Sequence, residues 1–210
     1  MSSGRAMPVV FLALALGVRA AEGGFSNDRE QKVRYLLNFT EYVEWPAKAF
    51  ADAKAPIVIG IIGEDPFGDV LTTQAAEHRG RRRLEVRRFK GIMEFRGQET
   101  PGRRQDELVA KRKQKARALR ACHVLYVSRS EDAFLPQVFK TVRKANVLTV
   151  GDRPSFARQR RGGVIGFFEG DSGLSFEINL AAAGAAELKI SSKLLALAKV
   201  IRKEESSPKP

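Results

Sequence analysis

The sequence predicts an α/β fold: a three-layer α/β/α sandwich with a mixed, mostly parallel sheet and a C-terminal antiparallel hairpin. Three unbroken apolar runs are typical of strands buried on both faces. They are IVIGIIG at residues 57–63, CHVLYV at 122–127 and VLTV at 147–150. Helix-forming segments separate these runs, and that alternation favours a parallel sheet covered on both faces. Two further short runs, 163–168 and 174–178, flank a Gly- and Asp-containing loop and indicate the hairpin.

The first helix is expected over residues 31–46, QKVRYLLNFTEYVEWP, and to end at Pro46. Its apolar side chains cover an arc of about 220° on a helical wheel, whereas a surface helix needs a stripe of only about 100°. One side is therefore expected to pack on its own domain. The other side is a candidate partner-binding surface, and the alternative is that both sides are intradomain core. The candidate contacts are Tyr35, Phe39, Tyr42 and Trp45.

The other elements follow from local patterns. Asp65 is a candidate N-cap and Pro66 a candidate first residue of the second helix. Asn146 is a candidate left-handed helix stop, and Ser191 or Ser192 is expected to cap the last helix. The helix over residues 104–120 has a thin apolar face. Helices are expected at residues 66–77, 104–120, 132–144, 180–187 and 193–201, and a weak half-buried strand at 83–89.

The N-terminus has the layout of a secretory signal peptide. Arg5 precedes an apolar run of 12 residues, and Val18-Arg19-Ala20 resembles a cleavage site. The run is short for a membrane span; an uncleaved anchor or a start at Met7 are the alternatives. The predicted organisation is a signal peptide at residues 1–20, a flexible lead at 21–30, one α/β domain at 31–201 and a disordered tail at 202–210. The domain is therefore expected to be exported.

The net charge of +13 is concentrated in two segments. Residues 79–90 carry seven Lys or Arg and one acid, and residues 96–120 carry nine and three, so each segment is net +6. Such a patch attracts polyanions. Only Phe89 and Phe95 lie among these cations, and an exported chain would not meet nucleic acid, so no nucleic-acid partner is expected. A solvated basic face is the plain interpretation; anionic lipid or an acidic protein surface is the alternative.

The sequence contains none of the common catalytic or nucleotide-binding motifs. There is no HExxH, P-loop, GxGxxG or serine elbow, and Ser191-Ser192-Lys193 lacks the SxxK spacing. Cys122 and His123 are neighbours on a predicted strand, so they point to opposite faces and cannot share a metal site or dyad. We interpret Cys122 as core filler, with a reactive or intermolecularly paired thiol as the alternative, and His123 as structural. No metal, cofactor or catalytic residue is predicted.

One edge of the predicted sheet is a candidate ligand site. In a doubly wound sheet, ligands bind outside the carboxyl ends of the strands. The loop at residues 63–68 and the Gly151-Asp152 pair both follow buried strands. The acids there disfavour an anionic ligand and favour an amine, and a purely structural turn is the alternative. The candidate residues are Asp65, Phe67, Gly68 and Asp152.

Seven motifs together resemble the YfiR family of small exported proteins. They are YLLNFTEYVEWP, IVIGIIGEDPFGDVL, CHVLYVS, VLTVGD, GGVIGFFE, FEINLAAA and LKISSKLLALAKV, in that order, within residues 32–200. The resemblance implies a periplasmic α/β sandwich that represses a membrane-bound diguanylate cyclase by binding its periplasmic region, thereby lowering cyclic-di-GMP and biofilm output. Dimers are common in the family, so the resemblance also implies a periplasmic homodimer as one possible assembly. This chain departs from the pattern in its lone Cys122, where relatives often carry disulfides, and in its long basic segment at 96–120.

These observations lead to two hypotheses of different kinds. The first is a non-enzymatic periplasmic regulator that binds a membrane signalling protein. The second is a periplasmic small-molecule binding protein that acts as a sensor subunit, with its site near Asp65 and Asp152. The first hypothesis predicts that truncating Tyr42 or Trp45 leaves the melting temperature nearly unchanged.

Overall fold

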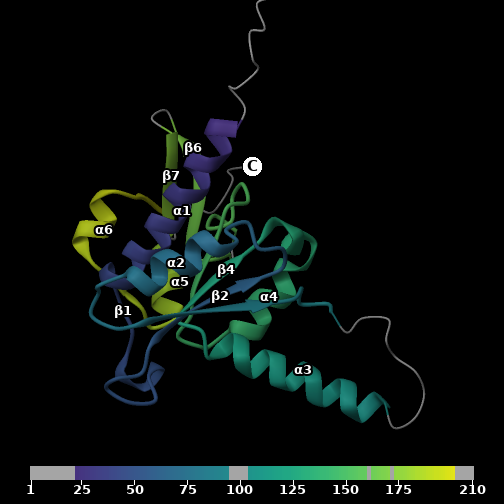
Figure 1. Ribbon diagram of the computed structural model, residues 1–210. Coiled ribbons are helices and arrows are strands. Elements are labelled where there is room, and N and C mark those ends of the chain that lie inside the picture. Colours follow the sequence, from purple (N-terminus) through teal and green to yellow (C-terminus); the bar gives the residue numbers. More distant parts are fainter. Residues whose placement is uncertain (1–21, 95–103, 160–161, 171–172, 202–210) are drawn as a thin grey trace, which may run out of the picture.

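The computed structural model describes residues 22–94, 104–159, 162–170 and 173–201 (Figure 1). Its helices are α1 (Glu22–Tyr42), α2 (Asp69–Glu77), α3 (Arg104–Arg120), α4 (Leu135–Val142), α5 (Leu180–Ala185) and α6 (Ser192–Ala196), with short 3-10 helices η1 (Ala47–Ala49) and η2 (Arg129–Phe134). Its strands are β1 (Val43–Glu44), β2 (Ile57–Ile62), β3 (Leu84–Phe89), β4 (Val124–Val127), β5 (Leu148–Gly151), β6 (Ile165–Gly170), β7 (Gly173–Asn179), β8 (Lys189–Ile190) and β9 (Lys199–Ile201).

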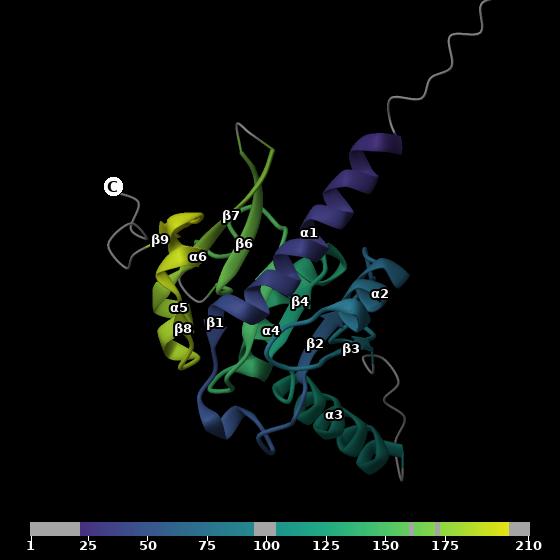
Figure 2. The ribbon, with the colours of Figure 1, turned by 60° about the vertical axis from the view of Figure 1, so that its left-hand side comes forward.

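A seven-stranded mixed sheet in the order β3-β2-β4-β5-β6-β7-β9 confirms the predicted fold class. All of its pairs are parallel except the β6–β7 hairpin. Helices α1 and α2 cover one face together with α5 and α6, and α3 and α4 cover the other (Figure 2). The central strands β2, β4 and β5 are buried at every position, because side chains on both faces meet a helical layer.

Helix α1 lies across the sheet and buries most of its wide apolar arc within this chain. Phe39 is fully buried, and its ring packs 6.0 Å from Phe167 and 5.3 Å from Phe176 of the hairpin, centroid to centroid. Tyr35 lies 5.2 Å from Phe176 in an edge-on arrangement. The C-terminal segment adds Leu188 and Leu194 to the same core. The excess apolar surface of α1 is thus covered by the hairpin and the α5–α6 segment.

The bounds of α1 differ from the prediction at both ends. The helix begins at Glu22, so residues 22–30 continue it backwards where a flexible lead was expected. It ends at Tyr42, four residues before Pro46. Val43 and Glu44 instead pair antiparallel with Ile190 and Lys189 as strand β1. A long-range partner, not the proline, therefore decides where the helix stops.

The predicted last helix is wrong beyond Ala196. Residues 199–201 form β9, which pairs parallel with β7, so the hairpin is not at the sheet edge. The Ser191 cap is confirmed, because its side-chain oxygen accepts from the backbone N–H of Leu194. The left-handed residue after α4 is Lys144, with φ 61°, in place of Asn146.

Predictions at the two ends of the chain fall outside the described residues; these are the signal peptide at 1–20 and the tail at 202–210. Within the described part, no helix combines the length and the hydropathy that crossing a bilayer requires.

Candidate functional site

A cleft of about 210 Å³ opens at the carboxyl ends of β2, β4 and β5. The strand order reverses at this place in the sheet. The chain goes from β2 to β3 on one side of it and then crosses to β4 on the other side, so the switch point lies between β2 and β4. Ligands in doubly wound sheets bind at such points. The cleft is lined by Glu64, Asp65, Pro66, Tyr126, Ser128, Arg129, Ser130 and Asp152.

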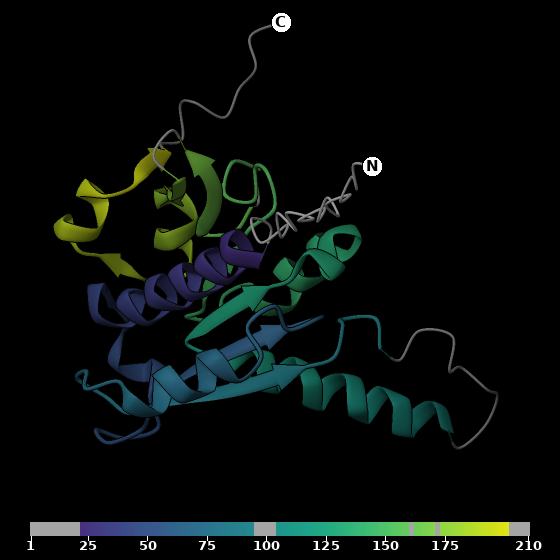
Figure 3. The same ribbon diagram turned by 45° about the horizontal axis from the view of Figure 1, so that its top comes forward.

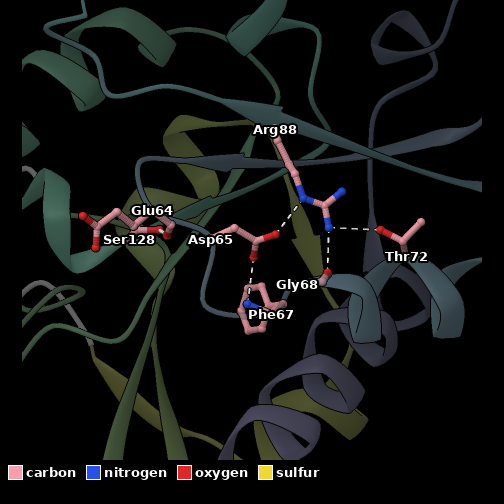
Figure 4. Close-up of polar contacts among 7 residues, drawn as sticks. All are labelled: Glu64, Asp65, Phe67, Gly68, Thr72, Arg88 and Ser128. Atoms are coloured by element: carbon pink, nitrogen blue, oxygen red, sulfur yellow. Dashed lines mark hydrogen bonds and ion pairs between the residues drawn. The ribbon is translucent and has the colours of Figure 1, made fainter.

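Asp65 shapes the loop after β2 (Figure 4). One carboxylate oxygen accepts from the backbone N–H of Phe67 at 2.7 Å, and the other accepts from Arg88 Nε at 2.6 Å. The same guanidinium donates to the Gly68 carbonyl at 2.7 Å and to Thr72 Oγ1 at 3.1 Å, which ties the loop to the first turns of α2. The helix itself begins at Asp69 with Gly68 as N-cap at φ 55°, not at Pro66 as predicted. Asp65 therefore acts as a turn former before the helix.

The other two expected residues of this loop do not face the cleft opening. Phe67 is fully buried, and its ring meets Tyr126 edge-on at 4.7 Å, so it supports the cleft from the core side. Gly68 is exposed and supplies the left-handed φ of the turn. The loop is also fastened to the segment after β4. Ser128 Oγ donates to the Glu64 carbonyl, and the Glu64 N–H donates to Ser130 Oγ at 2.9 Å.

Asp152 carries the charge at the centre of the site. Its Oδ2 accepts from Lys32 Nζ of α1 at 2.8 Å, and its Oδ1 lies 3.4 Å from Arg129 Nε. The Arg129 guanidinium also donates to the Asp152 carbonyl at 3.1 Å. Oδ1 is buried without a hydrogen bond among the described groups. Burial, reinforced by the Asp152 carboxylate, raises the pKa of Tyr126, which stays a neutral phenol.

The structure thus brings Asp65 and Asp152 together, as predicted, and adds residues that sequence reasoning missed. Ser128 and Arg129 directly follow strand β4, and the rule that carboxyl ends of parallel strands share one edge was sufficient to find them. Lys32 had no such signal, because its contact with Asp152 spans 120 residues.

The four aromatic residues of the candidate partner surface are mostly covered. Phe39 is fully buried, which excludes its side chain from a contact surface, and Tyr35 packs in the same aromatic cluster. Trp45 Nε1 donates to the His123 carbonyl at 3.1 Å, and Trp45 packs against the core. Only Tyr42 of the four is exposed, at 37%.

His123 and Cys122 occupy structural positions on opposite faces. His123 Nδ1 accepts from the buried Val58 N–H at 3.0 Å, and Nε2 lies 3.1 Å from the Ala49 carbonyl, so the ring is neutral with the proton on Nε2. Burial lowers the pKa of His123. Burial raises the pKa of the Cys122 thiol to about 12, which leaves it protonated at neutral pH. In the described part of the chain, no three His, Cys, Asp or Glu side chains gather as metal ligands would.

Comparisons with known proteins give a family and a fold. A family model described as YfiR/HmsC-like matches residues 29–199. No curated protein matches the chain. The fold is similar to the crystal structure of a conserved domain protein from Vibrio cholerae O1 biovar eltor str. N16961, with a TM-score of 0.53 at 13% identity. That match covers 83% of this chain and 60% of the Vibrio chain, so this chain spans less than two thirds of its length.

Proposed function

Since this chain belongs to the YfiR/HmsC-like family, we propose that it is a non-enzymatic periplasmic regulator that binds and represses a membrane-bound signalling enzyme. The enzyme is a diguanylate cyclase, and repression lowers cyclic-di-GMP. A cleavable signal peptide exports the chain. The family match over residues 29–199 carries the proposal.

The geometry supports a binding role. Two of the three carboxylates that line the cleft are engaged in internal contacts: Asp65 with a backbone N–H and Arg88, and Asp152 with Lys32. The thiol is buried and protonated. Among the described residues, the cleft holds no nucleophile paired with a general base, the arrangement that activates a side chain for covalent catalysis.

The best supported contact surface lies where α1 meets the C-terminal segment. Tyr42 is 37% exposed at the end of α1, and its carbonyl accepts from the N–H of Ser191, the N-cap of α6. Leu197, the C-cap of α6, is 73% exposed, the largest value for a big apolar side chain in the described residues. Tyrosine is enriched among the residues that dominate interface affinity, and the exposed leucine on the adjoining element extends the apolar surface beside it.

The experiment is capture of the membrane partner with the purified mature chain in neutral detergent, followed by measurement of cyclic-di-GMP in a deletion strain. We expect Tyr42→Ala and Leu197→Ser to weaken capture of a diguanylate cyclase by at least fivefold, while Val109→Ala on α3, 40% exposed, leaves it unchanged. Unchanged cyclic-di-GMP after deletion, together with no captured cyclase, would refute the proposal.

A second function, a small-molecule sensor, is favoured by the cleft itself. It lies at the switch point of the sheet and leaves Asp152 Oδ1 buried without a hydrogen bond. Its volume of 210 Å³ is below the range of drug-sized sites, about 300–1,000 Å³, so we expect a compact ligand. The acidic residues that line the cleft favour an amine. Lys32 would connect ligand and partner, since it joins the cleft to α1.

Thermal unfolding against a panel of small amines tests the sensor. A ligand at 100 times its Kd should stabilise the fold by about 2.7 kcal/mol. Asp152→Asn should abolish that gain, and Asp69→Asn, an exposed acid on α2, should keep it. A panel without shifts, or a shift that survives Asp152→Asn, would contradict the sensor and leave the regulator proposal intact.

A further inference from the structure

The charge of this chain is strongly asymmetric in space. Net charge is +13, and residues 79–90 and 96–120 hold nearly all of it. The described parts of these segments are β3 with its approach, which forms one edge of the sheet, and α3, which covers the sheet on the side away from α1. Helix α3 lies on the opposite side of the molecule from α6 in all three views (Figure 1, Figure 2 and Figure 3).

Helix α3 buries only a narrow stripe. Leu108 and Leu119 are buried at 7% and 0%, and the residues on the opposite side are exposed. Between residues 105 and 120 the helix carries six Lys or Arg against two acids. At 17 residues it is about 25 Å long. A helix of this composition gains little from packing, and most of its charged side chains are exposed.

The outward side of α3 carries the residues that we call the α3 stripe. Val109, Lys113, Arg117 and Arg120 follow one another at spacings of four, four and three, which places them on one side of the helix. Val109 is an exposed apolar residue, and Lys113, Arg117 and Arg120 are exposed cations.

Ion pairs within the chain do not neutralise the cations of the α3 stripe. Lys111 pairs with Glu107 at 3.2 Å on the flank, and Lys115 pairs with Glu94 at 2.8 Å beneath the helix. Arg120 donates from Nε to the Thr141 carbonyl, which carries no charge to neutralise it. Within the described parts of the chain, Lys113 and Arg117 have neither an ion pair nor a side-chain hydrogen bond.

We propose that the α3 stripe lies on the anionic lipid headgroups of the membrane that holds the regulated enzyme. Three features favour a lipid surface. The three cations are aligned along about 10 Å of one side of the helix, and an exposed valine lies one turn before them. Arginine and lysine stems bury their methylenes while the charged ends reach phosphates. Docking there confines the regulator to the layer in which its partner's periplasmic region is found. This inference rests on the proposed function for the presence of a membrane, but not on the identity of the partner.

Co-sedimentation with protein-free vesicles tests the stripe, using the full mature chain. We expect binding to vesicles that contain phosphatidylglycerol, weakened by salt, and no binding to vesicles of phosphatidylcholine alone. Each cation near an anionic surface contributes roughly fivefold in affinity, so Lys113→Gln/Arg117→Gln should reduce binding by roughly 25-fold.

The matched control is Lys189→Gln/Lys193→Gln, which removes the same charge from exposed residues of β8 and α6. It should leave vesicle binding within twofold. Equal losses in both double variants would mean attraction by net charge and overturn the proposal, as would absence of binding to the anionic vesicles. Poly-glutamate binding that is lost in Lys113→Gln/Arg117→Gln, with vesicle binding retained, would assign the stripe to an acidic protein. Because the vesicles contain no protein, these outcomes are independent of whether a cyclase is captured in detergent.

Discussion

His123 joins two segments of the fold through both ring nitrogens, and its replacement by leucine is the sharpest test of how the sheet is fixed. Nδ1 of the ring accepts from the Val58 N–H of β2 at 3.0 Å, and Nε2 lies 3.1 Å from the carbonyl of Ala49 in η1, before β2. Phe50 stacks on it at 4.5 Å with an interplanar angle of 23°. Leucine preserves most of the volume but neither polar contact nor the aromatic stack.

The cost can be built from these contacts. A buried Val58 N–H left without an acceptor costs about 1–3 kcal/mol, and the bond to Ala49 contributes about 1 kcal/mol. The lost stacking on Phe50 adds about 0.5–1.5 kcal/mol. We therefore expect His123→Leu to lower the free energy of unfolding by about 3–5 kcal/mol at pH 7.5, measured by urea unfolding.

The same geometry sets a pH dependence. A protonated ring has no acceptor for Val58 N–H, and burial lowers the pKa of His123 in the folded state below 6.5. The stabilisation is therefore fully present above about pH 6.5 and is lost as the pH falls toward the folded pKa, by at most about 1.4 kcal/mol per pH unit.

His123→Leu should lack this loss between pH 6.5 and 5.5. Trp45→Phe should keep it, because it removes the bond to the His123 carbonyl but retains an aromatic ring beside the imidazole. A cost below 1 kcal/mol, or the wild-type pH slope persisting in His123→Leu, would refute the reasoning.

Three further changes separate core from surface. Phe39→Ala should lower the free energy of unfolding by about 3–5 kcal/mol, because a fully buried ring is removed; Tyr42→Ala should change it by less than about 0.5 kcal/mol in the same urea assay. Trp45→Phe should cost about 1 kcal/mol through the lost indole hydrogen bond, and no change in the urea midpoint would contradict that role. Asp152→Asn should lower the free energy of unfolding by about 1–3 kcal/mol, since its carboxylate is 11% exposed and pairs with Lys32 of α1. A destabilisation that vanishes only in high salt would instead indicate a screened surface ion pair.

The sequence was sufficient for those parts of the fold that local pattern controls. The buried runs at residues 57–63, 122–127 and 147–150 became β2, β4 and β5, and α3 has the predicted bounds, Arg104–Arg120. The C-terminal failure has a physical cause. Residues 197–201 have helical apolar spacing, but β7 offers an unpaired edge, and Lys199, Val200 and Ile201 satisfy their backbone groups by pairing with it.

The sequence was sufficient to predict which backbone segments form the candidate site. It was not sufficient to predict which side-chain atoms of the site are already paired. The rule on carboxyl ends located Asp65 and Asp152, but whether their oxygens are free depends on Arg88 and Lys32, whose contacts span 23 and 120 residues. For the same reason, the expectation that truncating Trp45 leaves stability unchanged conflicts with its bond to His123, 78 residues away.

The position of the α3 stripe fixes how the molecule would be oriented at a membrane, and this orientation can be measured. With α3 against the headgroups, α6, whose C-cap is Leu197, lies on the opposite side of the molecule, so the partner must reach it through a segment that extends well above the bilayer. Single labels at Lys113→Cys and Leu197→Cys report the difference, because the buried Cys122 thiol has a pKa of about 12 and stays unreactive at neutral pH. On phosphatidylglycerol vesicles, a headgroup-attached quencher should suppress fluorescence from the label at 113 and leave that at 197 unchanged. Equal quenching at both labels would show that the molecule has no fixed orientation on the membrane.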